Sequence, residues 1–392
     1  MKFRIVIPIV LFVTVLLGPV LLVSGVAPDG LEWTIDSTGL EGTFTSIAVD
    51  SSGRPHISYN DTNMLDYANL KYAYKDGTGW HSLTIDSSGI SNAAYTSMVL
   101  DGDDYPHICY RDSDNNLKYA HEDAGGWHTE NATSEGGSEG DNCSIGLDDD
   151  GYPHISYHDY NVTLPDGHLK YAYKDATGWH IESFAADGDY TDIVLDSNGY
   201  PHISYRNRDA TYNTQLGYAY KDITGWHFTI LDSEGSYNSI ALNSENYPQI
   251  SSGSSDLQYA YKDDTGWHFE TVDSAGTVGR YTSLALDSSG NPHISYYDFT
   301  NKNVKYAYQD DTGWHLQIVG SASIGAPYSS LALDSGGSPH ISYYDWTNSD
   351  LKYAYAQFIS YRVYLPMVAK KQAVQRPLPR ERERPRAPYG RG

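Results

Sequence analysis

Basic side chains are scarce in this chain of 392 residues, which has 26 Lys and Arg against 50 Asp and Glu and a formal charge of −24 at pH 7. The first 27 residues carry a net charge of +2 and the last 23 carry +6, so the stretch between them carries about −32. A surface this acidic repels the phosphates of DNA and RNA. The sequence therefore predicts no nucleic-acid partner.

Long apolar runs are absent except at the start, where Ile5–Val23 follows the basic residues Lys2 and Arg4 and is followed by small residues from Ser24. This order is typical of a secretory signal peptide, which we assign to residues 1–27. An uncleaved membrane anchor is the alternative, because the run is close to the shortest length that spans a bilayer. We expect a secreted or surface-exposed protein that contacts a membrane only through an uncleaved N-terminal segment.

A helical hydrophobic period is also missing, and seven copies of one strand-rich repeat take its place. Each copy contains Pro-His-Ile-Ser-Tyr or a near variant, and its proline recurs at intervals of 44 to 51 residues. The seven prolines are Pro55, Pro106, Pro153, Pro201, Pro248, Pro292 and Pro339. A period of this length indicates a repeat architecture in which each unit packs on its neighbours.

The sixth copy shows the pattern of one unit. Its strand-like segments are Tyr281–Asp287, Pro292–Tyr296, Val304–Tyr308 and Trp314–Val319, and turn residues separate them. Four short antiparallel strands match one blade of a β-propeller. Residues 28–357 are therefore predicted to form an all-β, seven-bladed β-propeller of four-stranded antiparallel blades.

The ends of the repeat region predict how the ring closes. Copies one to six contain Gly-Trp-His, whereas the seventh stops at Leu351–Tyr355 and lacks a fourth strand. A surplus strand, Leu31–Asp36 with Trp33, precedes the first copy. We predict that this N-terminal strand completes the last blade and covers its open edge.

Only two cysteines occur, and they lie in adjacent repeats. Cys109 replaces the Ser of the second Pro-His-Ile-Ser-Tyr segment, and Cys143 lies at the entry to the first strand of the next copy. In an oxidising compartment the two side chains could meet across the interface between these units. A disulfide and a pair of buried thiols both remain open.

Short turns between the third and fourth strands carry a recognisable motif. The motif Asp-x-Thr-Gly-Trp occurs at Asp76–Trp80, Asp222–Trp226 and Asp263–Trp267. These turns resemble a degenerate Asp-box of the sialidase family, without its leading Ser and one spacer residue. The whole repeat resembles the short-blade propellers of secreted bacterial proteins, including sialidase-like and lectin-like seven-bladed propellers. This resemblance implies a fold rather than an activity.

Most of the 15 histidines recur at two repeat positions, after the blade proline or after Trp. Residues that recur once per blade are spread around a ring and do not converge on one ion. We expect them to hydrogen-bond turns or neighbouring strands, and we predict no metal site and no cofactor. A site formed by His158, His168, Asp159 and Asp166 in one loop remains an alternative.

The candidate site lies among the loops that differ between copies, which join the second strand to the third and the fourth strand to the next first strand. An aromatic residue opens the first strand in six copies, with Asn142 as the exception: Phe44, Tyr95, Tyr190, Tyr237, Tyr281 and Tyr328. An acid follows the second strand in five copies: Asp61, Asp112, Asp159, Asp298 and Asp345. If the first strand is innermost, aromatic rings and carboxylates surround the channel mouth, an arrangement suited to sugars. The alternative is that the aromatics plug the channel and the acids cap their loops.

We therefore expect an exported, monomeric, non-catalytic propeller that binds carbohydrate or a cell-surface protein. A sialidase-like glycoside hydrolase or lyase is the alternative, and it would need an arginine cluster. Arg111, Arg206, Arg208 and Arg280 are available for one, although no Phe/Tyr-Arg-Ile-Pro motif occurs. A purely structural scaffold is the second alternative.

Residues 358–392 follow the predicted ring. Phe358–Val368 is apolar and strand-like, and the stretch from Lys370 onward is basic and rich in Pro and Arg. That composition predicts a disordered tail.

Overall fold

The structure is a computed structural model, and it describes residues 31–61, 68–90, 95–133, 140–159, 168–184, 186–208, 213–231, 235–322 and 328–358. The predicted signal peptide and the predicted tail beyond Phe358 lie outside these residues. Within the described ranges, no helix is long and apolar enough to cross a membrane.

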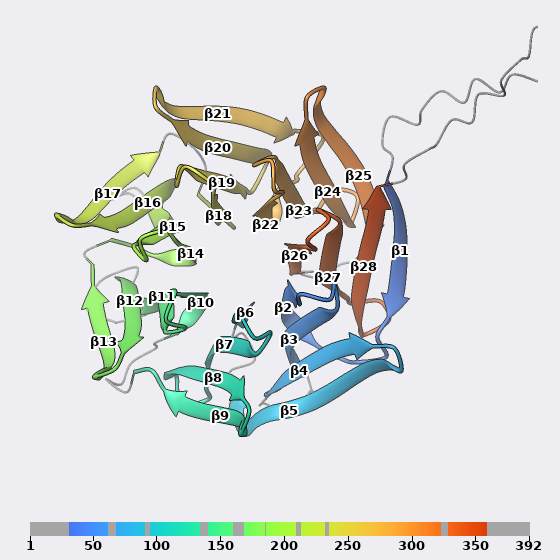
Figure 1. Cartoon of the computed structure of the whole chain (residues 1–392). Coiled ribbons are helices and arrows are strands. Elements are labelled where there is room, and N and C mark those ends of the chain that lie inside the picture. The colour runs from blue at the N-terminus through green and yellow to red at the C-terminus, as the bar shows by residue number, and fades with distance from the viewer. Residues whose placement is uncertain are drawn as a thin grey trace, which may run out of the picture. The chain divides into compact units, whose positions relative to one another are not determined.

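The described residues form seven sheets of four antiparallel strands around a common axis, as the repeat predicts (Figure 1). Blade one contains β2 (Thr43–Val49), β3 (Pro55–Asp61), β4 (Ala68–Asp76) and β5 (Gly79–Ile90). Blade two contains β6 (Ser97–Leu100), β7 (Pro106–Arg111), β8 (Leu117–Asp123) and β9 (Gly126–Asn131). Blade three contains β10 (Asp141–Leu147), β11 (Pro153–Asp159), β12 (His168–Asp175) and β13 (Gly178–Ser183). Blade four contains β14 (Asp189–Leu195), β15 (Pro201–Arg208), β16 (Thr214–Asp222) and β17 (Gly225–Leu231).

The remaining blades follow the same plan. Blade five contains β18 (Ser239–Leu242), β19 (Pro248–Gly253), β20 (Leu257–Asp263) and β21 (Gly266–Asp273). Blade six contains β22 (Arg280–Leu286), β23 (Pro292–Asp298), β24 (Asn303–Asp310) and β25 (Gly313–Ser321). Blade seven contains β26 (Ser329–Leu333), β27 (Pro339–Asp345) and β28 (Asp350–Phe358), and it is completed by β1 (Leu31–Ser37).

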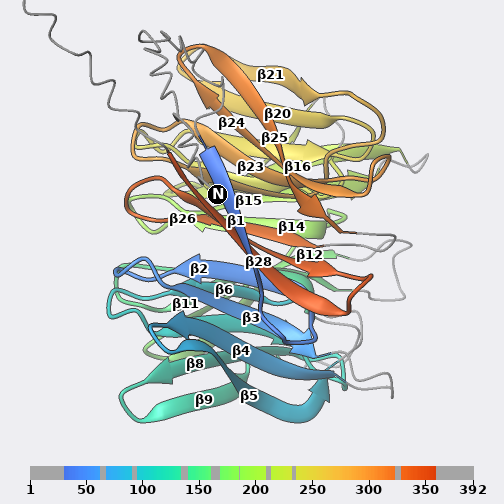
Figure 2. The same ribbon diagram turned by 90° about the vertical axis from the view of Figure 1, so that its right-hand side faces the viewer.

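The predicted closure of the ring is confirmed. β1 pairs antiparallel with β28, with Trp33 opposite Ala356, on the outer side of the ring (Figure 2). The Trp33 ring meets the edge of Tyr306 in blade six at a centroid distance of 5.2 Å. Trp80 of blade one meets Tyr353 of blade seven in the same way at 5.3 Å. The N-terminal strand therefore supplies both the missing backbone pairing and the missing aromatic contact.

The first strand of each blade is the innermost one, and hydrogen bonds join these strands into a closed circle. In six of the seven blades, the inner strand donates a backbone N–H to a serine of the preceding blade, as Met98 does to Ser46 at 3.1 Å. In blade five the acceptor is a carboxylate instead, because Ile240 donates to Asp192 at 2.9 Å. The other donors are Ile47, Ile145, Ile193, Leu284 and Leu331, which bond to Ser330, Ser97, Ser144, Ser239 and Ser283.

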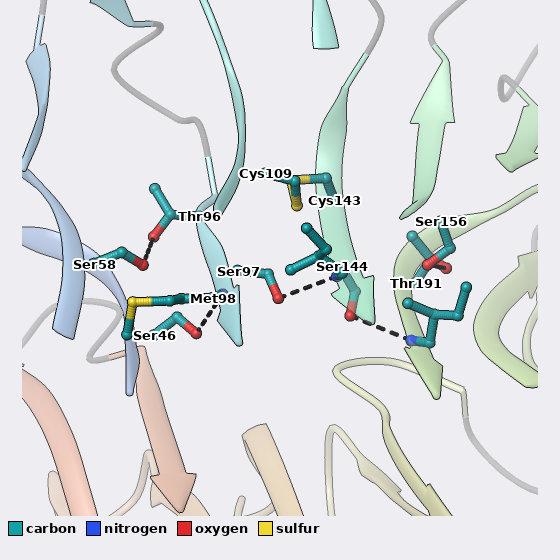
Figure 3. Close-up of a disulfide and its surroundings, with 12 residues drawn as sticks. Ser46, Ser58, Thr96, Ser97, Met98, Cys109, Cys143, Ser144, Ser156 and Thr191 are labelled. Carbon is teal, nitrogen blue, oxygen red and sulfur yellow. Dashed lines mark hydrogen bonds between the residues drawn. A yellow bond between two sulfur atoms is a disulfide. The ribbon is translucent and has the colours of Figure 1, made fainter. Parts of the chain in front are cut away.

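A second circle of contacts joins the second strand of each blade to the inner strand of the next. Figure 3 shows the part of this circle around the disulfide. Hydroxyl groups meet at most interfaces, as Ser58 does with Thr96 at 2.9 Å. Between blades two and three the same contact is a disulfide between Cys109 and Cys143, whose Cα atoms are 6.3 Å apart. The disulfide therefore lies inside the packed interface of two blades, near the channel.

The repeated histidines are structural, as the repeat predicts. The His after each blade proline bonds through Nδ1 to a tyrosine hydroxyl on the third strand, as His202 does with Tyr218 at 2.6 Å. Burial lowers the pKa of His202 to about 4, so the ring is neutral at pH 7. In blade five, where Gln249 replaces the histidine, its side-chain carbonyl accepts the hydrogen bond of Tyr259.

Candidate functional site: the channel mouth

Six aromatic side chains close one end of the channel. The structure brings together Phe44, Tyr95, Tyr190, Tyr237, Tyr281 and Tyr328, all partly buried, and we name this set the aromatic rosette. Neighbouring rings touch at tilted or edge-on angles, with centroid distances from 4.4 to 6.3 Å. Tyr95 donates to the hydroxyl of Tyr328 at 3.3 Å. The predicted ring of aromatics is therefore one continuous cluster on the axis.

Four of the six rosette residues, together with Asn142, have an unusual backbone conformation. Phe44, Asn142, Tyr190, Tyr237 and Tyr281 have φ angles between 50° and 54°. The left-handed region suits Asn but costs a bulky side chain about 1–2 kcal/mol. The ladder between first and second strands shifts its register at this point, for example between Thr43 and Ser46. The resulting bulge places the aromatic ring over the channel.

At four of the interfaces, a side chain of the next blade holds this conformation in place. The residue after the mouth position in the next blade donates a hydrogen bond to the backbone carbonyl of the aromatic residue. Thr96 donates to Phe44 at 3.0 Å, and Thr282 donates to Tyr237 at 2.6 Å. The amide of Asn238 takes the same role for Tyr190 at 2.8 Å. These bonds to a neighbouring blade offset the local strain, so the rosette depends on ring closure.

A cavity of about 180 Å³ is lined by the rosette residues and by the small, mostly polar residues that follow them in each inner strand. The layer of inner serines contains one exception, Asp192, which accepts hydrogen bonds from Ser144 at 2.6 Å and from Ser239 at 2.9 Å. Burial raises the pKa of Asp192 despite these bonds. Sequence reasoning missed this carboxylate, although its departure from the serine of the other repeats was a visible signal.

Charged side chains gather on one side of the mouth, around blades three and four. Asp189 binds the guanidinium of Arg206 and accepts a hydrogen bond from Asn142 at 2.7 Å. The Arg206 guanidinium lies over the Tyr190 ring, 4.7 Å from its centroid. Such a stacked, ion-paired arginine has a fixed orientation. This combination of aromatic and charged groups occurs where the rosette is broken by Asn142.

The five predicted acids lie at the loops of their own blades. Asp298 accepts from the backbone and side-chain amides of Asn301, both at 2.8 Å, and is 3% exposed. Asp61, Asp112 and Asp345 cap their loops in the same way, through Asn69, Asn116 and Asn348. Asp159 pairs with Lys170 at 2.9 Å. The structure therefore brings the aromatics together, whereas these carboxylates serve their own loops and strands.

Two of the four candidate arginines, Arg206 and Arg208, lie near the same carboxylate, whereas the other two have different partners. Arg111 lies 3.4 Å from Asp141, and Arg280 lies over Phe299 at 4.3 Å from the ring centroid. Arg208 lies 4.0 Å from Asp187 and 3.9 Å from Asp189, which also binds Arg206.

The alternative loop site is divided between different contacts. His158 is fully buried, with Nε2 3.7 Å from Asp187, and His168 donates to the carbonyl of Phe184 at 2.8 Å. Asp166 lies outside the described residues. Among the residues that the structure describes, no three His, Cys, Asp or Glu side chains lie close enough to hold a metal ion.

The turns that resemble the Asp-box are closed by their own side chains. Asp222 accepts from the Thr224 hydroxyl at 2.6 Å, from the Thr224 amide at 2.7 Å and from His227 at 3.0 Å. The hydrogen bonds from the Thr224 hydroxyl and from His227 lower the pKa of Asp222 to about 2. The motif therefore acts within its own turn.

No protein-family model matches the chain, and no curated protein matches it in sequence. Solved structures are similar in fold. A protein of unknown function from Dyadobacter fermentans has 12% identity and a TM-score of 0.52, over 84% of this chain and 100% of that one. The Aleuria aurantia lectin in complex with Fucα1-6GlcNAc has 13% identity and a TM-score of 0.50, over 73% and 98%. An ulvan lyase of polysaccharide lyase family 25, bound to -[GlcA(1-4)Rha3S]-, has 11% identity and a TM-score of 0.55, over 82% and 95%. At these identities the likeness shows the fold alone.

Proposed function

We propose that this chain is an exported, non-catalytic propeller that binds a neutral carbohydrate at its channel mouth. The observation that carries the proposal is the aromatic rosette, a partly exposed cluster of six rings beside a group of fixed polar side chains. Sugars present C–H faces that pack on aromatic rings and hydroxyl groups that bond to polar neighbours.

The tyrosine hydroxyls of the rosette are suited to this role. Burial raises the pKa of Tyr95 and of Tyr190 well above the ordinary value, so both phenols keep their protons at neutral pH. A protonated phenol can both donate to and accept from a sugar hydroxyl. The hydroxyl of Tyr95 already lies 3.3 Å from that of Tyr328, within the same cluster.

The charge of the ring favours a neutral ligand. The chain between its two basic ends carries about −32, and this field repels an anionic polysaccharide at low salt. Arg206 and Arg111 lie beside Asp189 and Asp141, which offset their charge.

The comparisons support carbohydrate as the ligand class. The Aleuria aurantia lectin binds a fucosylated disaccharide on a similar fold, and the ulvan lyase binds an anionic one. A lyase or hydrolase would need a general base that reaches the substrate. His158 beside Asp187 has that chemistry, but its imidazole is fully buried. We therefore propose binding without cleavage.

A glycan-array screen of the full chain tests this proposal. We expect binding to neutral glycans that is lost in Tyr281→Ala, which removes one rosette ring, and kept in Phe269→Ala, which removes an exposed ring from outer strand β21. Each array hit is then incubated with the protein and the products are sized. Absence of binding to every glycan favours a scaffold, and shortened products favour an enzyme.

A further inference from the structure

One of the seven equivalent positions at the channel mouth is not aromatic. Asn142 takes the place in blade three that a Phe or Tyr takes in the other six blades. Its φ of 50° matches those of Phe44 and Tyr281, so the bulge is retained. Gly140 is retained two residues earlier, where a Cβ would lie 3.0 Å from the Cα of Leu117. Blade three therefore keeps the backbone of the rosette and changes only the side chain.

The rosette is loosest at this position. Tyr95 and Tyr190, on the blades that flank Asn142, have centroids 6.3 Å apart. The other contacts around the rosette have centroid distances of 4.4 to 5.1 Å. Two aromatic rings thus border a position occupied by a short amide.

The polar groups at this gap are held in place by one another. Asn142 donates to Asp189, which also accepts the backbone N–H of Tyr190 at 3.0 Å and binds Arg206. Asp189 is 5% exposed and Asn142 is 8% exposed. Preorganised polar groups of this kind lose little conformational entropy when a ligand binds.

Asn142 also has an unused acceptor. Its Oδ1 is buried and has no hydrogen-bond partner among the described residues. A buried carbonyl without a hydrogen-bond partner destabilises the folded protein. A ligand hydroxyl that reaches Oδ1 after a small rotation of the amide recovers this cost.

We propose that the ring binds a single carbohydrate molecule at the gap in the rosette, with Asn142 Oδ1 accepting a sugar hydroxyl between the rings of Tyr95 and Tyr190. This inference rests on the proposed function, and it adds where the carbohydrate binds and how many molecules each ring binds. A ring with seven equal blades would offer seven equal sites. Among the described mouth positions, that of blade three alone combines a non-aromatic residue with a charged partner, so we expect one ligand molecule per ring.

Isothermal titration and saturation-transfer NMR of the full chain test the inference, with methyl α-L-fucoside, methyl β-D-galactoside, methyl α-D-mannoside and methyl β-D-glucoside as probes. Asn142→Tyr fills the gap with the residue that five other blades have at this position, in a conformation that Tyr190, Tyr237 and Tyr281 already adopt. Asn142→Gly tolerates the same φ and removes the whole side chain, Oδ1 included, without filling the gap. Phe299→Ala removes an exposed aromatic of blade six outside the rosette and serves as the control.

We expect one molecule of glycoside per chain, at least a tenfold loss of affinity in both Asn142 variants, and less than a twofold change in Phe299→Ala. A glycoside that binds wild type and Asn142→Tyr equally, or binds with several molecules per chain, overturns the location but leaves the proposed function standing. Failure of wild type to bind any probe or any arrayed glycan overturns both. Thermal unfolding of each variant verifies that the fold is retained.

Discussion

Cys109 and Cys143 form their disulfide at the place where hydroxyl pairs join the neighbouring blades. On one side of it Ser58 meets Thr96 at 2.9 Å, and on the other Thr191 donates to Ser156 at 2.7 Å (Figure 3). One covalent link therefore replaces one hydrogen bond in a circle of equivalent contacts. The repeat itself shows which residues the disulfide has replaced.

Replacing both cysteines by their repeat equivalents should preserve the fold at reduced stability. In Cys109→Ser with Cys143→Thr, we expect a hydroxyl pair like that of Ser156 and Thr191. Loss of a disulfide typically costs about 2–4 kcal/mol, and the new hydrogen bond returns about 1 kcal/mol. Thermal unfolding with and without reductant measures the change. If a double alanine variant is as stable as the Ser–Thr variant, the hydroxyl pair does not substitute for the disulfide.

Asp192 should be replaceable by the serine of the other blades with a gain in stability. Burial raises the pKa of this carboxyl, so the folded state binds its proton more tightly than the unfolded state. The stabilisation that comes from binding this proton is therefore present at low pH and is lost as the pH rises through the pKa of Asp192 in the folded state. We expect Asp192→Ser to raise the free energy of unfolding at pH 7 by about 1 kcal/mol or more. Denaturant titrations at pH 7 and pH 4 should show this gain shrinking at the lower pH.

Acid should destabilise the ring through its buried histidines. Burial lowers the pKa of His202 from 6.5 to about 4, so the unfolded state binds the proton more readily and stability is lost as the pH falls below 6.5. The pKa shift of His202 corresponds to a loss of at most about 3 kcal/mol in the free energy of unfolding. His202→Gln copies Gln249 of blade five, which accepts the equivalent tyrosine hydrogen bond without titrating. We expect this variant to be more stable than wild type at pH 5, measured by thermal unfolding, and equal stability there would contradict the account.

Ring closure should depend on Trp33 more than on an equivalent tryptophan inside the chain. Trp33 contacts Tyr306 at 5.2 Å and Trp267 contacts Tyr218 at 5.3 Å, both edge-on. Truncation of either to alanine should cost about 3–5 kcal/mol. Only Trp33→Ala also loosens the terminal strand β1 and exposes the edge of β28, which invites edge-to-edge association. Light scattering should therefore show concentration-dependent aggregation for Trp33→Ala and not for Trp267→Ala.

The architecture could be predicted from the sequence because every blade repeats the same few contacts. The spacing of the prolines set the number of blades, and the missing strand after Tyr355 matched the surplus strand around Trp33. The strands expected in the sixth copy agree with β22 to β25 within about two residues. The recurrence of one His per blade indicated a hydrogen bond to a turn or a neighbouring strand, and His202 bonds to Tyr218 on the neighbouring strand.

The detail of the mouth could not be predicted in the same way. The left-handed backbone at Tyr190 is fixed by Asn238 of the next blade, 48 residues away, and local propensity disfavours it for a tyrosine. The roles of Asp189 and Asp192 also depend on contacts across blades. Departures from the repeat consensus, at Asn142 and Asp192, were the signals that the sequence did contain.

The most direct measurement is a crystal structure of the full chain soaked with a glycoside that it binds. The account predicts electron density for one sugar at blade three, between the rings of Tyr95 and Tyr190, with a hydroxyl within hydrogen-bond distance of Asn142 Oδ1. Density for sugar between blades at the rim, or at several mouth positions at once, would contradict it.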